Sequence, residues 1–206
     1  PPGIALLKGT AVHVGAEFNY EQKVASREDL PAKQIVDRAV AAFDDRMNAD
    51  GLMLSDEEKS AGEAKVVGEA KDSTAAMASV LAGQIAPNVQ PVAVEQEQKI
   101  TLPDSTHDLL GYIDLLDENG WIRDLKTTGK TKPQREWDDS LQFTMYSLMH
   151  RAKYGKDAAG VKIDQIVSLK SGPVYKPAET FRDMADYKAL VNRINAVVNG
   201  IKAGIA

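Results

Sequence analysis

The feature that most constrains the fold is a short stretch with the pattern of a β-hairpin. Two apolar runs, 109–116 and 121–125, are joined by Asp117-Glu118-Asn119-Gly120. An Asn-Gly pair between two such runs is the strongest short-range hairpin signal, because both residues tolerate the left-handed conformations that a tight turn needs. The two runs are therefore predicted to be antiparallel neighbours in a sheet.

This hairpin brings three charged residues close together. Asp114 lies in its first strand, and Asp124 and Lys126 lie in its second strand. Because side chains alternate along a strand, Asp124 and Lys126 share a face, and Asp114 can approach them from the neighbouring strand. Mg²⁺ binds one or two carboxylates and keeps waters and phosphate oxygens as its other ligands. The pattern indicates a divalent-metal site acting on phosphate, and a surface hairpin with a salt bridge is the alternative.

Four motifs along the chain, in this order, resemble those of the PD-(D/E)XK nuclease superfamily. They are most similar to the RecB-like exonuclease branch, which includes phage and CRISPR-associated nucleases. The matching residues are Gly9 to His13 in an N-terminal helical segment, Gly111 to Asp114, Asp124 to Lys126, and Gln142 to Tyr146. The resemblance spans residues 9–146.

The resemblance implies an α/β (α+β) fold with a PD-(D/E)XK, restriction-endonuclease-like core. A central mixed sheet of about four strands would be flanked by helices. We expect residues 1–206 to form a single nuclease domain. Within it, 26–86 would be a helical insertion, 92–170 the catalytic sheet and helix, and 181–203 a C-terminal helix.

The spacing of hydrophobic residues predicts the individual helices and strands. Apolar residues three and four apart predict helices, and short apolar or alternating runs predict strands. Helices are predicted over 4–24, 35–47, 55–71, 73–85, 138–154 and 181–201, and strands over 92–102, 109–116, 121–125 and 161–170. The polar, basic stretch 127–133 is predicted to be a loop.

The resemblance also implies a set of metal ligands. Asp114 and Asp124 would bind Mg²⁺ or Mn²⁺, and His13 and the backbone carbonyl of Leu125 would complete the ligand set. A histidine among oxygen ligands favours tolerance of Mn²⁺. For a histidine considered alone, a role in the core or on the surface is the more common reading, and the family pattern is what favours a ligand.

Relatives of this branch carry a glutamate in the strand before the Gly-x-x-Asp motif. Glu95 is our choice for that position, and Glu97 is the alternative because it faces the same way along the strand. A solvent-facing strand with charged side chains would show the same pattern.

Other residues would handle the substrate. The resemblance implies that Lys126 activates the attacking water and stabilises the transition state. It also implies that Gln142 and Tyr146 position the DNA strand near the scissile phosphate. Gln142 and Tyr146 lie four residues apart, so they project from one helix face. Thr127 and Lys130 could contact phosphates, although a solvated loop would also explain them.

Charge and cysteine content limit the possible functions. The net charge of −5 disfavours a broadly basic nucleic-acid-binding surface, but five basic residues against one acid occupy 123–135, around the candidate site. The chain has no cysteine, which excludes disulfides and a cysteine-ligated iron–sulfur cluster. Its apolar runs are too short for a membrane span, and a cytoplasmic protein of a bacterium or a phage-infected host is expected.

These expectations combine into a metal-dependent DNA exonuclease for recombination, end resection or genome processing, with a phage source in keeping with its size. The alternatives are a structure-specific endonuclease and a non-cutting nucleic-acid-binding protein on the same fold. Partners would be single-stranded DNA or duplex ends. Because the sequence has no P-loop, processive action would need a helicase, a recombinase or a homo-oligomer. The chain begins Pro1-Pro2-Gly3, which suggests that N-terminal residues are missing.

Overall fold

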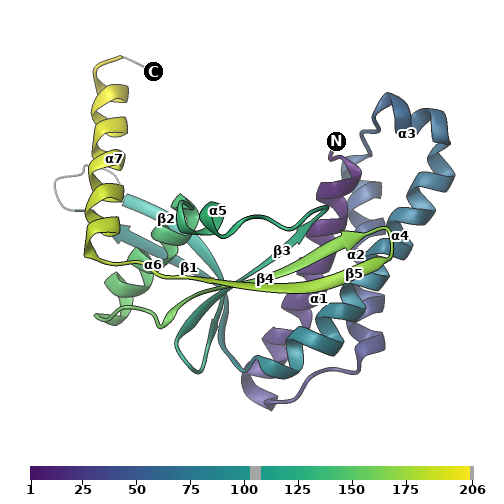
Figure 1. Ribbon diagram of the computed structural model, residues 1–206, viewed down its shortest axis with the longest axis horizontal. Helices are drawn as coiled ribbons and strands as arrows, with labels where there is room; N and C mark the ends of the chain where they lie inside the picture. The colour runs from purple at the N-terminus through teal and green to yellow at the C-terminus, as the bar shows by residue number, and fades with distance from the viewer. Residues whose placement is uncertain (103–107, 205–206) are drawn as a thin grey trace. The chain divides into compact units, whose positions relative to one another are not determined.

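The computed structural model describes residues 1–102 and 108–204 (Figure 1). Its helices are α1 (Ile4–Ser26), α2 (Ala32–Asp50), α3 (Asp56–Ala61), α4 (Glu63–Val80), α5 (Gln134–Asp138), α6 (Leu141–Tyr154) and α7 (Met184–Lys202), with short η1 (Leu81–Ile85) and η2 (Ala86–Asn88) turns after α4. Its strands are β1 (Pro91–Thr101), β2 (Asp108–Asp117), β3 (Trp121–Thr128), β4 (Gly160–Leu169) and β5 (Gly172–Thr180).

The strands form a five-stranded sheet in the order β1-β2-β3-β4-β5. The predicted class, an α+β fold with a mixed sheet flanked by helices, is confirmed. The predicted hairpin is present, and β2 pairs antiparallel with β3 through Leu115↔Arg123 and Leu116↔Ile122. The Asp117 carboxylate stabilises its turn by accepting hydrogen bonds from the backbone N–H groups of Asn119 at 2.9 Å and Trp121 at 3.0 Å.

The prediction of about four strands was one too few, because β5 was missed. Its sequence carries Pro173 and Pro177, and Ser171-Gly172-Pro173 was interpreted as the end of the preceding strand. A proline cannot donate a ladder hydrogen bond, so it is tolerated in a strand at the edge of a sheet. The observed strand order puts β5 at that edge.

Three boundaries also differ from the predictions. Strand β3 continues to Thr128, so Thr127 belongs to the strand and not to the predicted loop. The helix predicted over 138–154 begins later, at Leu141, because Ser140 caps the start of α6 with its side chain, and the short helix α5 precedes it. The break between the two predicted helices lies at Gly62 and not near residue 72. Helix α4 continues through residue 72 without interruption.

Contacts divide the chain into two compact units, which we describe separately. The first unit comprises Pro1–Val94, Leu125–Thr131 and Asp164–Pro177, and the second comprises Glu95–Asp124, Lys132–Ile163 and Ala178–Ala206. Strands β1, β3, β4 and β5 each contribute residues to both units. The expectation of one nuclease domain stays a prediction.

Helices α1, α2 and α4 pack side by side in the first unit (Figure 1). Buried apolar residues from all three meet between them: Leu7 and Ala11 from α1, Ala42 and Phe43 from α2, and Ala70 from α4. Small alanines at these contacts let the helix backbones approach closely. Helices α2 and α4, which lie within the predicted insertion 26–86, thus pack with α1 around a shared apolar core.

The second unit contains a glycine that two aromatic rings enclose. Gly160, at the start of β4, has a φ of +153°. A Cβ atom there would lie 2.6 Å from Cζ3 of Trp121 and 2.9 Å from Cε1 of Phe181. The two rings meet edge to face, with centroids 5.7 Å apart. Only a glycine fits this position without displacing a ring.

None of the helices in the described part of the chain has the length and apolar character needed to cross a membrane.

Replacing Gly160 by alanine should destabilise the protein by about 1–3 kcal/mol, because the added methyl group overpacks the Trp121–Phe181 contact and disfavours the observed φ. Urea unfolding followed by Trp fluorescence would measure the loss. Gly68→Ala is the matched control, since nothing lies within 4 Å of a Cβ at that exposed position in α4. It should be neutral or stabilising by up to about 1 kcal/mol. Equal stabilities of Gly160→Ala and the unsubstituted protein would contradict this packing argument.

Candidate functional site

Two aspartates face one another across the β2–β3 hairpin in the second unit. The observed register, continued by one residue, sets Asp114 opposite Asp124. Directly opposed residues have Cα atoms about 4.5–5.5 Å apart. Asp124 is fully buried, and Asp114 is half-buried. Two carboxylates held this close repel each other, and a bound cation would offset the repulsion.

Helix α6 brings a tyrosine to these acids. Tyr146 is buried, and its hydroxyl oxygen accepts a hydrogen bond from Nε2 of Gln142 at 2.7 Å. Burial raises the pKa of the Tyr146 phenol, the charges of Asp114, Asp124 and Glu95 raise it further, and the Gln142 hydrogen bond lowers it in part. The phenol therefore stays protonated at neutral pH. The electrostatic effect of three acids on one hydroxyl means that all three lie near it within this unit.

Glu95 has an unusual backbone conformation inside β1. Its φ is +43°, in the left-handed region that favours glycine. A non-glycine residue held there costs on the order of 1–3 kcal/mol, and such residues are concentrated at functional sites. Glu97, the alternative, instead accepts a hydrogen bond from the Tyr112 hydroxyl at 2.6 Å. Glu95 is thus the glutamate whose charge reaches Tyr146.

The first unit holds the other predicted residues. His13 and Lys126 line one open cavity of about 390 Å³, together with Gly9, Thr10, Leu125 and further residues of α1 and β3. Gly9 permits this arrangement, because a Cβ atom there would lie 2.9 Å from Oγ1 of Thr127. The Gly9 to His13 pattern therefore has a physical basis: the glycine lets α1 approach β3, and the histidine follows one turn later.

The remaining candidates lie at the end of β3. The Leu125 side chain is buried, while Thr127 lines the cavity of Lys126 and His13. Lys130 is exposed, and its carbonyl accepts a hydrogen bond from the Thr128 hydroxyl at 2.7 Å. Asp124 and Lys126 are two residues apart in β3, so they share a face of that strand. The roles assigned to all these residues stay predictions.

The acids fit a hard divalent cation in donor type. Within 1–102 and 108–204, no group of three or more His, Cys, Asp or Glu side chains is arranged to hold a metal ion. Mg²⁺ is typically bound by one or two carboxylates, with waters and substrate phosphates as its other ligands. Asp114 and Asp124 are such a pair, whereas His13 belongs to the other unit.

Arg182 is a residue of the second unit that sequence reasoning missed. Its guanidinium donates to Oγ1 of Thr144 at 2.7 Å, to Oγ1 of Thr180 at 2.6 Å and to the carbonyl of Phe181 at 2.7 Å. It also donates to the carbonyls of Trp137 at 2.8 Å and Ser140 at 3.2 Å.

These bonds tie the end of β5 to the α5–α6 turn and so hold the start of the helix that carries Gln142 and Tyr146. Only the position of Arg182, directly before the capping residue Asp183, hints at such a role in the sequence.

Lys8 of α1 was also missed. It lies beside Gly9 of the first motif and is the sole charged residue among the first ten. A cation in an otherwise apolar start of a helix could have drawn attention to it.

The sequence and the fold were compared with those of known proteins. The family model of the PD-(D/E)XK nuclease superfamily matches residues 3–206. None of the curated proteins compared with the sequence matches it. Among solved structures, one described as a "putative exonuclease" from Eubacterium rectale has a TM-score of 0.52 at 12% identity, covering 87% of this chain and 70% of that chain. The crystal structure of SSO0001 has a TM-score of 0.36 at 14% identity, covering 96% and 76%.

Replacing Arg182 by lysine should lower the free energy of unfolding by about 2 kcal/mol or more, because three ammonium donors cannot replace a planar fork that reaches five acceptors. Chemical denaturation would measure this loss. Arg193→Lys, at an exposed position on α7, should change stability by less than about 0.5 kcal/mol. If Arg182→Lys proved as stable as the Arg193→Lys control, the bonds of Arg182 would contribute little.

His150 should make stability dependent on pH. It is buried on α6, and its Nδ1 lies 3.2 Å from the carbonyl of Lys156. Burial lowers the pKa of His150 below 6.5, so the unfolded chain takes up a proton before the folded chain does.

Stability should therefore be greatest above pH 6.5 and fall, by at most about 1.4 kcal/mol per pH unit, as pH decreases below it. In His150→Gln, unfolding measured across this range should lose part of that dependence. Identical pH profiles for the two proteins would contradict the assignment.

Proposed function

Because the chain belongs to the PD-(D/E)XK nuclease superfamily, we propose that it is a metal-dependent exonuclease that hydrolyses phosphodiester bonds of DNA. The observation that carries the proposal is the pairing of Asp114 with Asp124 across the hairpin, with Lys126 following on the Asp124 face of β3. A protein that bound nucleic acid without cutting it would have no chemical need for this combination. The structural neighbour described as a putative exonuclease supports the exonuclease reading over an endonuclease.

Asp114 and Asp124 would hold Mg²⁺ or Mn²⁺, and the charge of Glu95 would act close by in the same unit. The bound ion would supply Lewis acidity toward the phosphate and a water of lowered pKa. The Lys126 ammonium would orient the attacking water and stabilise the negative charge that develops on the phosphate.

Tyr146 and Gln142 would position the DNA strand. The Tyr146 oxygen already accepts from Gln142, so the phenol proton can be donated to a phosphate oxygen. Its raised pKa keeps that proton in place at neutral and moderately alkaline pH. Thr127, near the end of β3, and Lys130, two residues beyond that strand, would contact neighbouring phosphates.

The biological roles that suit such an activity are recombination, end resection and genome processing. Processive digestion would require either a homo-oligomer around the DNA or a helicase or recombinase partner, since the sequence has no P-loop.

The test is degradation of end-labelled single- and double-stranded DNA with Mg²⁺, Mn²⁺ or EDTA. Cutting should require metal, and Lys126→Met should reduce the rate by about 10²–10³-fold, the usual cost of losing one transition-state donor. Asp114→Asn should reduce it at least as far. Lys59→Met, at an exposed position in α3, is the control and should retain full activity.

Three outcomes would overturn parts of this proposal. Cutting of a closed circular single strand would replace the exonuclease by an endonuclease. Metal-dependent cutting that survives both Asp114→Asn and Lys126→Met would remove these residues from the site. A folded protein that binds DNA but cuts none of the substrates in either metal would be a binding protein on a nuclease fold.

A further inference from the structure

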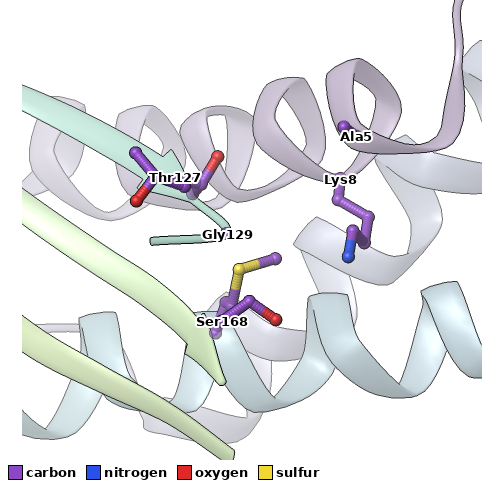
Figure 2. A pocket seen from close by; sticks show the side chains of 7 residues that line it. Ala5, Lys8, Thr127, Gly129 and Ser168 are labelled. Atoms are coloured by element: carbon purple, nitrogen blue, oxygen red, sulfur yellow. The ribbon is translucent and has the colours of Figure 1, made fainter. Parts of the chain in front are cut away.

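A second cavity in the first unit contains a lysine with no assigned role. Lys8 extends from α1 into a cavity of about 180 Å³ between α1, α4 and the ends of β3 and β4 (Figure 2). The residues that line it are Ala5, Lys8, Met77, Thr127, Thr128, Gly129 and Ser168. All of them belong to the first unit.

The polar groups of this cavity are an ammonium and several hydroxyls. Nζ of Lys8 donates to Oγ of Ser73 at 3.3 Å, and Ser73 Oγ lies 3.4 Å from Oγ of Ser168. Thr127 and Thr128 add further hydroxyls, and Thr127 lies across the cavity from Lys8 (Figure 2). Ammonium and hydroxyl groups that converge from several directions match the oxygens of a tetrahedral anion, and lysine is a common phosphate-binding residue.

Electrostatics point to the same ligand. Burial lowers the pKa of Lys8, which means that its surroundings do not fully stabilise the ammonium. Among the described residues that line the cavity, none carries a carboxylate. An anion in the cavity would supply the missing negative charge and stabilise the ammonium of Lys8.

The cavity adjoins that of Lys126 and His13. Ala5 and Thr127 line both cavities, and the residues that follow Lys126 in β3 lead from one to the other. A nucleic-acid strand carries its phosphates at regular intervals, so a strand with one phosphate at Lys126 has others nearby.

We propose that the Lys8 cavity binds a phosphate group of the nucleic-acid strand, other than the phosphate that is attacked beside Lys126. The inference rests on the proposed function for the source of the phosphate. The ammonium of Lys8 would pair with the anion, and the hydroxyls of Thr127, Thr128 and Ser168 would donate to its oxygens. Lys8 would thereby fix how far the strand advances past the site.

The first test is independent of DNA and uses inorganic phosphate as the probe. Lys8 is acylated by an amine-reactive reagent, and mass spectrometry follows the rate with phosphate or with chloride at equal ionic strength. Phosphate should slow acylation of Lys8 in a saturable way, because it covers the amine and raises its pKa. Exposed Lys59 should be unaffected. Ser168→Ala should weaken the protection. No protection beyond that given by chloride would overturn the proposal.

The second test measures DNA binding in EDTA, where no cutting occurs. Loss of one phosphate contact should reduce the slope of log affinity against log salt by about 0.7 for single strands and 0.9 for duplexes. Lys8→Met should show this reduction, and Lys8→Arg, which keeps the charge, should not. Lys33→Met, at a largely exposed position in α2, is the control with an unchanged slope. An unchanged slope in Lys8→Met would overturn the proposal.

Substrate ends identify which phosphate is bound. If Lys8→Met weakens binding only of strands with a 5′-phosphate, and not of 5′-hydroxyl strands, the cavity holds a terminal phosphate; equal weakening assigns an internal one, and both support the proposal. If phosphate protects Lys8 from acylation and the protein binds DNA but does not cut it, the Lys8 site is supported and the proposed activity is overturned. Active cutting without protection would overturn the Lys8 site alone.

Discussion

The close approach of two aspartates across one hairpin is the constraint on which the rest of the site depends. The Asn119-Gly120 turn sets the register, and the register sets Asp114 opposite Asp124. Two carboxylates at that spacing repel each other when both are ionised. The fold holds them there by burying Asp124 and by packing α6 against β2, where Gly111 leaves room for Met149. Such an arrangement is stabilised when a cation neutralises the two carboxylates, so binding of a cation there would also stabilise the hairpin.

Strand β3 connects this pair to the basic side of the site. Its residues alternate between Asp124 and Lys126 on one face and Leu125 and Thr127 on the other. A strand rises by a fixed amount per residue, so backbone geometry sets the spacing between the Cα atoms of Asp124 and Lys126. The last two residues of the same strand, Thr127 and Thr128, carry uncharged hydroxyl groups.

The sequence was sufficient for features that are local. The hairpin followed from turn chemistry, and Asp124 with Lys126 followed from the two-residue strand period. It was insufficient for features that depend on contacts between residues far apart in the sequence. Strand β5 tolerates two prolines because it lies at the sheet edge, and the carbonyl of Ser140, the capping residue of α6, accepts a hydrogen bond from Arg182, which lies far along the chain. The hydroxyl groups near Lys8 come from Ser73 and Ser168, and no rule of helix or strand periodicity relates these residues to Lys8.

The backbone of Glu95 has a consequence for engineering. Its positive φ means that a glycine there would relieve strain. A screen for thermostable variants would therefore select Glu95→Gly. That substitution would remove the carboxylate whose charge reaches Tyr146. Under the role proposed for Glu95, selection for heat resistance and selection for turnover should favour different residues at this one position.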